Sequence, residues 1–168
     1  MPLTVLLLLP AALAAPIPTR IAALEGGITS SDLFVVGASV HPLSGLGVWG
    51  WVGPADLLHT WGAGLGYTGR IAQWETEETS WKGGLAGWNE LRLGPGVQYK
   101  RYAVSFLVDA EGQAMDGFAR LEVLKHPAPH LAVQSALDLG VSSFDPEPPA
   151  AGRIYPYLGM RVGLALTR

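Results

Sequence analysis

Histidines provide the spacing closest to a metal site in this chain. His126 and His130 lie four residues apart in HPAPH, the interval that brings two side chains to one face of a helix. Pro127 and Pro129 prevent a helix there, because proline has no N–H and its ring clashes with the preceding turn. The sequence contains no cysteine, so thiolate sites and disulfides are excluded. We therefore predict neither a metal ion nor another cofactor.

Side chains for nucleophilic catalysis are present by type but not in a recognisable order. A Ser–His–acid site could draw on six residues, which are Ser142, Ser143, His126, His130, Asp109 and Glu111. Their spacing singles out no set of three, and the chain has no G-x-S-x-G elbow or P-loop. The segment GAGLG (62–66) lacks the helix and lysine of a phosphate-binding loop, and its glycines alternate along one strand face. We predict that the protein is not an enzyme.

The elements that position these residues are β-strands. From Leu158 to Leu166 every second residue is apolar, whereas the residues between them are small or charged. A period of two is typical of a strand with two different faces. Thirteen prolines in 168 residues argue against long helices, and we find no helical run of apolar residues after the first fourteen positions.

Nine segments are candidate strands, separated by turns rich in Gly, Pro, Asp and Ser. They are 20–29, 33–41, 46–53, 57–71, 84–99, 102–109, 115–125, 130–143 and 154–167. A closed bacterial barrel normally has an even number of strands, so we expect eight. Either the weak first segment or the long segments 57–71 and 84–99 must then account for the odd count.

The composition of the less apolar face indicates whether the apolar face of these strands packs in a protein core or faces lipid. A soluble barrel carries long charged residues on its outside, but charged residues are only 15% of this chain and the second faces are mostly Gly, Ala, Ser, Thr and Gln. Small residues suit the crowded interior of a narrow barrel whose apolar face points to lipid. We therefore predict an all-β fold, a closed antiparallel transmembrane β-barrel of about eight strands.

A few charged residues fall on the small-residue faces. They are Arg92, Arg120, Glu122, Asp138 and Arg161. An isolated buried charge destabilises the folded protein by roughly several kcal/mol, so such charges must pair. We predict that they form a salt-bridge network that fills the lumen; a narrow gated polar path is the functional alternative.

Aromatic residues and one acidic segment are expected at the ends of the strands. The six Trp and five Tyr could form the aromatic girdles of a membrane barrel, and this set includes Trp49, Trp51, Trp61 and Tyr157. The polar segment QWETEETSWKGG (73–84) is predicted to be an external loop that carries three acids, Glu75, Glu77 and Glu78.

The N-terminus resembles an export signal. An apolar run from Leu3 to Leu9 precedes an Ala-x-Ala pattern at 12–14, so residues 1–14 are predicted to be a signal peptide and 15–168 a single domain. The net charge of −3 gives no basic footprint for nucleic acid, and we expect no nucleic-acid partner.

Signal peptide, alternation, glycine-rich faces and the final strand PYLGMRVGLAL together resemble the small bacterial outer-membrane β-barrel proteins, such as the membrane domain of outer membrane protein A. NELRLGPGVQYKRYAVSF (89–106) looks like an adjacent strand pair of that class. The chain departs from the family at its end, because Thr167-Arg168 stands where such barrels usually carry an aromatic residue.

The resemblance implies an integral protein of the Gram-negative outer membrane, porin-like in architecture. Membrane lipid and the outer-membrane assembly machinery would be its partners, and its role would be structural or the passage of a small ligand. Two alternatives stay open: a soluble, secreted, lipocalin-like barrel that binds a small apolar ligand, and an outer-membrane lipid-modifying enzyme.

Overall fold

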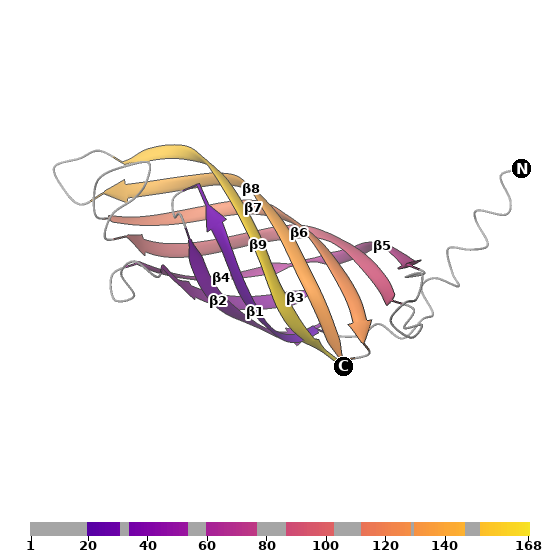
Figure 1. Ribbon diagram of the computed structural model, residues 1–168. Helices are drawn as coiled ribbons and strands as arrows, with labels where there is room; N and C mark the ends of the chain where they lie inside the picture. Colours follow the sequence, from indigo (N-terminus) through magenta and orange to yellow (C-terminus); the bar gives the residue numbers. More distant parts are fainter. Residues whose placement is uncertain are drawn as a thin grey trace, which may run out of the picture.

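Nine antiparallel strands form one sheet that closes on itself (Figure 1). The computed structural model describes residues 20–30, 34–53, 60–76, 87–102, 112–128, 130–146 and 152–168. The strands are β1 (Arg20–Thr29), β2 (Val35–Leu43), β3 (Leu46–Val52), β4 (Trp61–Tyr67), β5 (Gly69–Thr76), β6 (Gly87–Tyr102), β7 (Gly112–Ala128), β8 (Leu131–Pro146) and β9 (Arg153–Thr167). Neighbours in sequence are neighbours in space, except that β9 pairs with β1 and β4 pairs with β6.

The β4–β6 pairing closes the ring and reduces the nine strands to eight positions in the wall. β4 and β5 pair with successive parts of β6, and the register is the same from Trp61 to Arg70, so they are two halves of a strand interrupted at Thr68. The register shifts by one residue between Arg70 and Ala72. The Thr68 N–H turns away from β6 and donates to the carbonyl of Gly45, 2.8 Å away in the β2–β3 turn. Gly45 has a φ of 84°, which glycine adopts without strain. The prediction of a closed eight-stranded antiparallel barrel is confirmed.

The odd count of candidate strands does not come from the weak first segment, which is β1. β6 runs through to Tyr102 and pairs directly with β7, so residues 89–102 belong to one strand and the predicted boundary between 84–99 and 102–109 was wrong. Lys100, between the two candidate strands, points inward and continues the alternation of β6. Residues 103–111 lie outside the described part of the chain.

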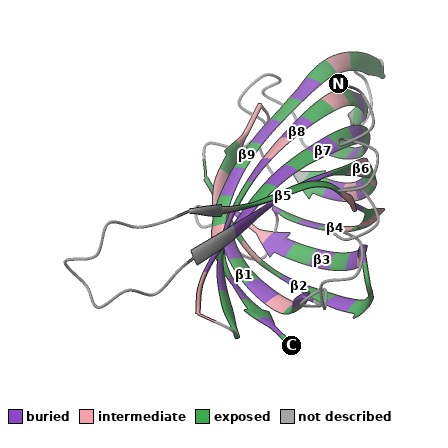
Figure 2. Ribbon diagram, turned by 90° about the vertical axis from the view of Figure 1, so that its right-hand side faces the viewer, coloured by how far each residue is buried: buried purple, intermediate pink, exposed green. Residues whose placement is uncertain are grey.

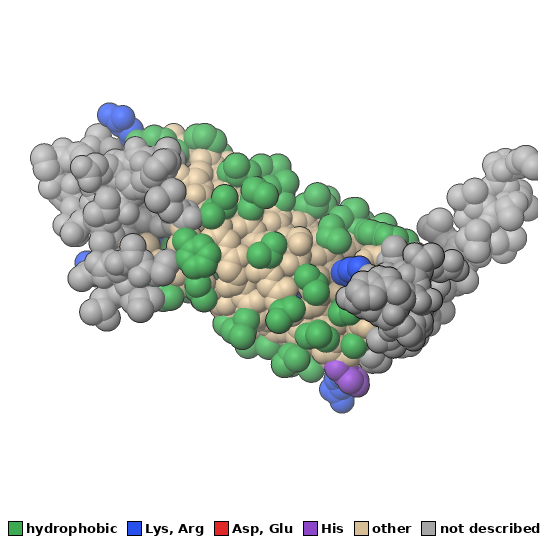
Figure 3. Space-filling model, viewed as in Figure 1, with side chains coloured by type: hydrophobic (Ala, Val, Ile, Leu, Met, Phe, Trp, Pro, Cys, Tyr) green, Lys and Arg blue, Asp and Glu red, His purple; other side chains and the backbone are tan. Residues whose placement is uncertain are grey.

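Buried and exposed residues alternate along the strands (Figure 2). The usual distribution is inverted, because large apolar residues are exposed and charged residues are buried. Outward-facing residues of β9 are apolar and exposed, as the sequence predicted; they are Leu158, Met160, Val162, Leu164 and Leu166. Arg161, between them, is buried. Figure 3 shows the same exterior, where apolar side chains cover the middle of the molecule. A surface of this kind is stable against lipid and not against water.

Two tryptophans predicted for the girdles lie inside the barrel instead. Trp49 and Trp51 of β3 are buried with Val35, Phe118 and Tyr157 in one cluster. The glycines of β4 leave space for the indoles: a Cβ at Gly62 would lie 2.4 Å from Trp51, and one at Gly66 would lie 2.9 Å from Trp49. The glycines of the GAGLG segment therefore make room for the two indoles inside the barrel.

Exposed aromatic residues do occur near both ends of the wall. Trp61 and Tyr99 contact each other on neighbouring strands, with ring centroids 5.5 Å apart, and Tyr67 and Trp74 are exposed toward the other end of β4–β5. Trp81 and the side chains of Trp88 and Tyr102 are outside the described part. No helix among the described residues has the length and apolar character that crossing a membrane requires.

The two ends of the barrel differ in their connections. Arg20 pairs with Thr167, so β1 begins and β9 finishes at the same end, together with the short connections 44–45 and 129–130. The connection 77–86 lies at this end too. Glu75, predicted to lie in the loop 73–84, is instead part of β5 and pairs with Trp88 of β6. Connections 30–34, 53–60, 103–111 and 147–152 lie at the opposite end. Glu77 and Glu78 are outside the described residues, and their external placement stays a prediction.

Candidate functional site: a charged interior

The lumen is filled with side chains whose charges balance. Among the described residues, five cations are buried: Arg20, Arg92, Lys100, Arg120 and Arg161. The matching acids, also five and buried, are Glu25, Glu90, Asp116, Glu122 and Asp138. Because each buried charge needs a partner, equal numbers allow the interior to be neutral as a whole.

Four of the five predicted network residues meet at the centre. Arg120 Nε and Nη2 donate to the two carboxylate oxygens of Asp138 at 2.7 and 2.9 Å, because the two residues are direct partners on β7 and β8. Arg161 Nε lies 3.5 Å from Asp138 Oδ2, and Glu122 Oε1 lies 3.9 Å from Arg120 Nη1. The bidentate pair fixes the plane of the guanidinium.

Arg92, the fifth predicted residue, belongs to a separate pair. Its Nε donates to Glu90 Oε2 at 2.7 Å, and the two residues lie two apart on the inner face of β6. Both are in the half of β6 that pairs with β5, whereas the central four lie on β7, β8 and β9.

β1 supplies two buried charges that were not among the predicted network residues, Arg20 and Glu25. Arg20 reaches across the lumen to Glu122 on the non-adjacent β7, with Nη2 3.3 Å from Oε2, and donates to Gln134 Oε1 at 2.6 Å. Gln134 donates in turn to Glu25, which lies 3.7 Å from Arg161. A register shift between Arg20 and Ala22 turns Arg20 inward, out of step with Glu25. Alternation alone could have found Glu25.

Gln98 joins the charged network to the aromatic cluster. Its Oε1 accepts from Trp49 and Trp51 at 3.3 Å each and from Arg161 at 3.1 Å. Its Nε2 donates to Asp116 at 2.7 Å and to the Tyr157 hydroxyl at 3.0 Å.

Cations also contact aromatic faces. The Arg120 guanidinium lies 4.4 Å from the ring centroid of Trp49, and Lys100 Nζ lies 4.8 Å from that of Tyr157 while it ion-pairs with Asp116 at 2.7 Å. These contacts stabilise charges that are fully removed from water.

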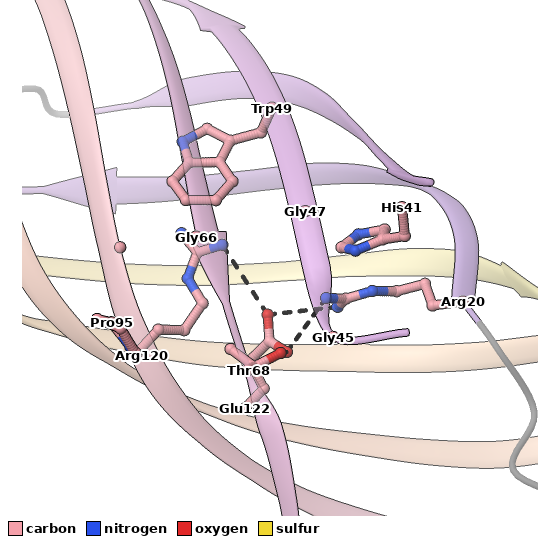
Figure 4. Close-up of a pocket in the computed structure, with 11 residues that line it drawn as sticks. Arg20, His41, Gly45, Gly47, Trp49, Gly66, Thr68, Pro95, Arg120 and Glu122 are labelled. Carbon is pink, nitrogen blue, oxygen red and sulfur yellow. Dashed lines mark hydrogen bonds and ion pairs between the residues drawn. The ribbon is translucent and has the colours of Figure 1, made fainter. Parts of the chain in front are cut away.

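One small cavity lies beside the network, near the β2–β3 turn (Figure 4). Its volume is about 10 Å³, room for about one water molecule. Glu122 lies between Arg20 and Arg120 there and also accepts from Thr68 Oγ1 at 3.1 Å.

Groups with hydrolase chemistry are not arranged as a triad among the described residues. Ser39 Oγ lies 3.1 Å from His41 Nε2, but the acid, Glu25, accepts from Ser39 and all three side chains are buried. His126 is buried and His130 exposed, so they do not share a face. No group of three or more His, Asp or Glu side chains suited to a metal ion occurs in the described part. Asp109 and Glu111 fall outside it.

Comparison with known proteins adds a loose structural likeness. No family model matches the chain, and no curated protein matches it. Among solved structures it is similar to Ail, the attachment invasion locus protein of Yersinia pestis, with 12% identity and a TM-score of 0.34. The likeness covers 89% of this chain and 99% of that one. The fold therefore rests on the strand pairing described above, and the resemblance to outer membrane protein A stays a prediction.

Proposed function

We propose that this chain is an integral outer-membrane β-barrel protein with a structural, non-enzymatic role in the envelope of a Gram-negative cell. The observation that carries the proposal is the inversion of the molecule: large apolar side chains outside, and ten paired or bridged charges inside. Membrane lipid is then the solvent of the outer wall, and the assembly machinery inserts the barrel from the periplasm.

The orientation of the faces favours this function over a lipocalin-like one. A soluble barrel that binds an apolar ligand directs its apolar faces to a central cavity. Here the apolar faces of β1 and β9 point outward, as Leu24, Ile28 and Val162 show, whereas the charges of Arg120 and Asp138 are buried inside.

A structural role is favoured over transport by the same interior. Conduction needs a continuous polar path, but Arg120 is paired with Asp138 and lies against the Trp49 ring, and both indoles donate to Gln98 inside the barrel. An eight-stranded barrel is only wide enough for side chains.

Fractionation of cells that express the full chain tests the membrane assignment. We expect the protein to stay in the outer-membrane fraction through alkaline and urea washes and to need detergent for release. Recovery in the soluble periplasmic fraction would contradict the proposal. The folded barrel should migrate differently on gels before and after boiling, and this provides the control for folding.

Planar-bilayer recording tests the closed interior. We expect no steady conductance from the refolded barrel, with a porin of known conductance as the positive control. A reproducible unitary current would replace the structural role with the gated path.

Lipid-modifying activity is tested by comparing lipid A and phospholipid profiles of deletion and parent strains. A changed profile would overturn the non-enzymatic assignment.

A further inference from the structure

β5 is paired along one edge and open along the other. Its register partners all belong to β6, and the pairing starts at Gly69 opposite Leu93. On the other side β3 begins at Leu46, opposite Tyr67 of β4, so no strand lies beside β5 there in the described part of the wall. Every other strand has a neighbour on both sides. An open edge presents N–H and C=O groups that another extended chain can pair with.

The hydrogen bond of Thr68 shows which backbone groups face the open edge. The Thr68 N–H points away from β6 and donates to the carbonyl of Gly45, in the turn that ends the wall on this side. Alternate residues of a strand direct their backbone groups to the same edge, so the N–H and C=O of Arg70 also point away from β6. The register shift of β5 comes only after Arg70. Arg70 therefore offers one donor and one acceptor at the open edge.

Both rows of side chains on β5 are exposed. Ile71, Ala72, Gln73 and Trp74 are exposed in succession, whereas buried and exposed residues alternate along β7. Two of these four residues, Ile71 and Trp74, are large and apolar. β5 has therefore left the packed wall, and another chain can approach its open edge and contact apolar side chains there.

The open edge lies at the end of the barrel where β9 finishes, because β5 continues from β4 toward that end (Figure 1). Open sheet edges do not occur in hydrocarbon, since no water is present to satisfy their backbone groups. Two connections at this end, 44–45 and 129–130, are short, as periplasmic turns are in bacterial barrels. Under the proposed function the edge faces the periplasm, where a soluble polypeptide can reach it.

Two occupants supplied by the chain itself fit this edge poorly. A two-fold axis that pairs two copies of β5 antiparallel is normal to the wall, so it lies in the membrane plane and would invert one of the barrels. After the predicted cleavage only residues 15–19 precede β1, which is three wall positions from β5. That separation is about 14 Å, and five extended residues span about 17 Å, so hardly any residue would remain to pair.

We propose that the open edge of β5 is a docking site for an extended segment of a periplasmic protein, which adds to the sheet as a further strand. The segment runs antiparallel to β5, in line with β3, and bonds to the backbone of Arg70. Its apolar row contacts Ile71 and Trp74, and its other row is polar. The barrel is then the membrane anchor of that protein. The inference rests on the proposed function, because this end faces the periplasm only in a membrane-spanning barrel.

Three variants separate the backbone contact from the side-chain contacts. Arg70→Pro removes the N–H at the open edge and no bond to β6, a change that an edge strand tolerates. Arg70→Gln is the matched control, because it changes the same side chain and keeps the N–H. Trp74→Thr keeps the whole backbone edge and removes an apolar contact.

The experiment titrates the refolded full chain in detergent micelles with a fluorescein-labelled peptide, Thr-Val-Thr-Val-Thr-Val-Thr, and measures fluorescence anisotropy. The same peptide with every amide N-methylated is the control for binding that does not use the backbone. We expect the parent to bind only the unmodified peptide. Arg70→Pro should weaken this binding about tenfold, Trp74→Thr about threefold, and Arg70→Gln not at all.

Absence of peptide binding by the parent would overturn the site, as would equal binding by the parent and by Arg70→Pro. Binding that appears only after deletion of residues 1–19 would assign the edge to the chain's own N-terminus instead. A dimer that Arg70→Pro converts to a monomer would assign it to a second copy. The boiling-dependent gel shift and membrane retention of every variant are recorded in parallel. Loss of those in the parent refutes the membrane assignment, whereas loss of peptide binding alone refutes only the docking site.

Discussion

The two halves of the inner wall fill the same lumen in different ways. β2, β3 and β4 contribute no buried Asp, Glu, Lys or Arg among their described residues; they supply Trp49 and Trp51 and the glycines opposite them. β1 and β6 to β9 supply all ten buried charges. The stability of the aromatic half (β2–β4) depends on how well side-chain volumes fit, and that of the charged half (β1 and β6–β9) depends on ion pairing. Gln98 and Arg120 connect the two halves, because each contacts Trp49. Changes to the charged half should therefore cost more than changes to the aromatic half.

The largest effect is expected at Asp138. Replacing it by Ala leaves Arg120 and Arg161 without their shared carboxylate, and breaking a buried pair in this way costs about 3–5 kcal/mol. Urea unfolding of the barrel in lipid vesicles measures the loss. Asp145→Ala, at the exposed end of the same strand, is the control and should cost about 1 kcal/mol or less. Equal losses at the two positions would show that the pairing is not the source of stability.

Val162→Arg on the outer wall provides a reference for both halves. A charge facing hydrocarbon near mid-membrane should destabilise the barrel by about 2–4 kcal/mol and reduce the assembled fraction. Ser143→Arg, exposed near the end of β8, should cost about 1 kcal/mol or less, because the cost falls toward the interface. Normal stability of the Val162 variant would place this wall outside the hydrocarbon.

In the aromatic half, Gly62→Ala tests the dependence on volume. The new Cβ would lie 2.4 Å from the Trp51 ring, and such overpacking costs about 1–3 kcal/mol. The companion variant Gly62→Ala with Trp51→Phe relieves the overlap and should recover part of the loss, again by urea unfolding. Gly50→Ala, on the outer face, should be nearly silent. No recovery in the double variant would contradict the packing interpretation.

The smallest effect is expected where the two halves meet. Tyr157→Phe removes the hydroxyl that accepts from Gln98 at 3.0 Å and keeps the ring against Phe118, at a centroid distance of 5.4 Å. One neutral hydrogen bond is worth about 1 kcal/mol. A loss as large as that of Asp138→Ala would mean that the aromatic half also depends on polar pairing.

The orientation of the strand faces could be predicted from the sequence for some strands and not for others. On β7, β8 and β9 the apolar and polar rows are distinct, so Arg120, Glu122, Asp138 and Arg161 could be assigned to the interior from their positions alone. On β3 both rows are apolar, since Val48 and Val52 alternate with Trp49 and Trp51. The row that carries the indoles turns inward there because β2 and β4 place glycines opposite the indoles, and outward indoles would leave the lumen empty.

Alternation by itself determined that this protein is a two-faced, all-β chain and that the scarce charges of its later strands are sheltered. It did so because the period of two is a local property of each strand. Only the closed ring decided the partners of these charges, the inward turn of Arg20 at a register shift, and the interruption at Thr68. Those features depend on contacts between strands, and the one between Arg20 and Glu122 joins residues 102 positions apart across the closed ring.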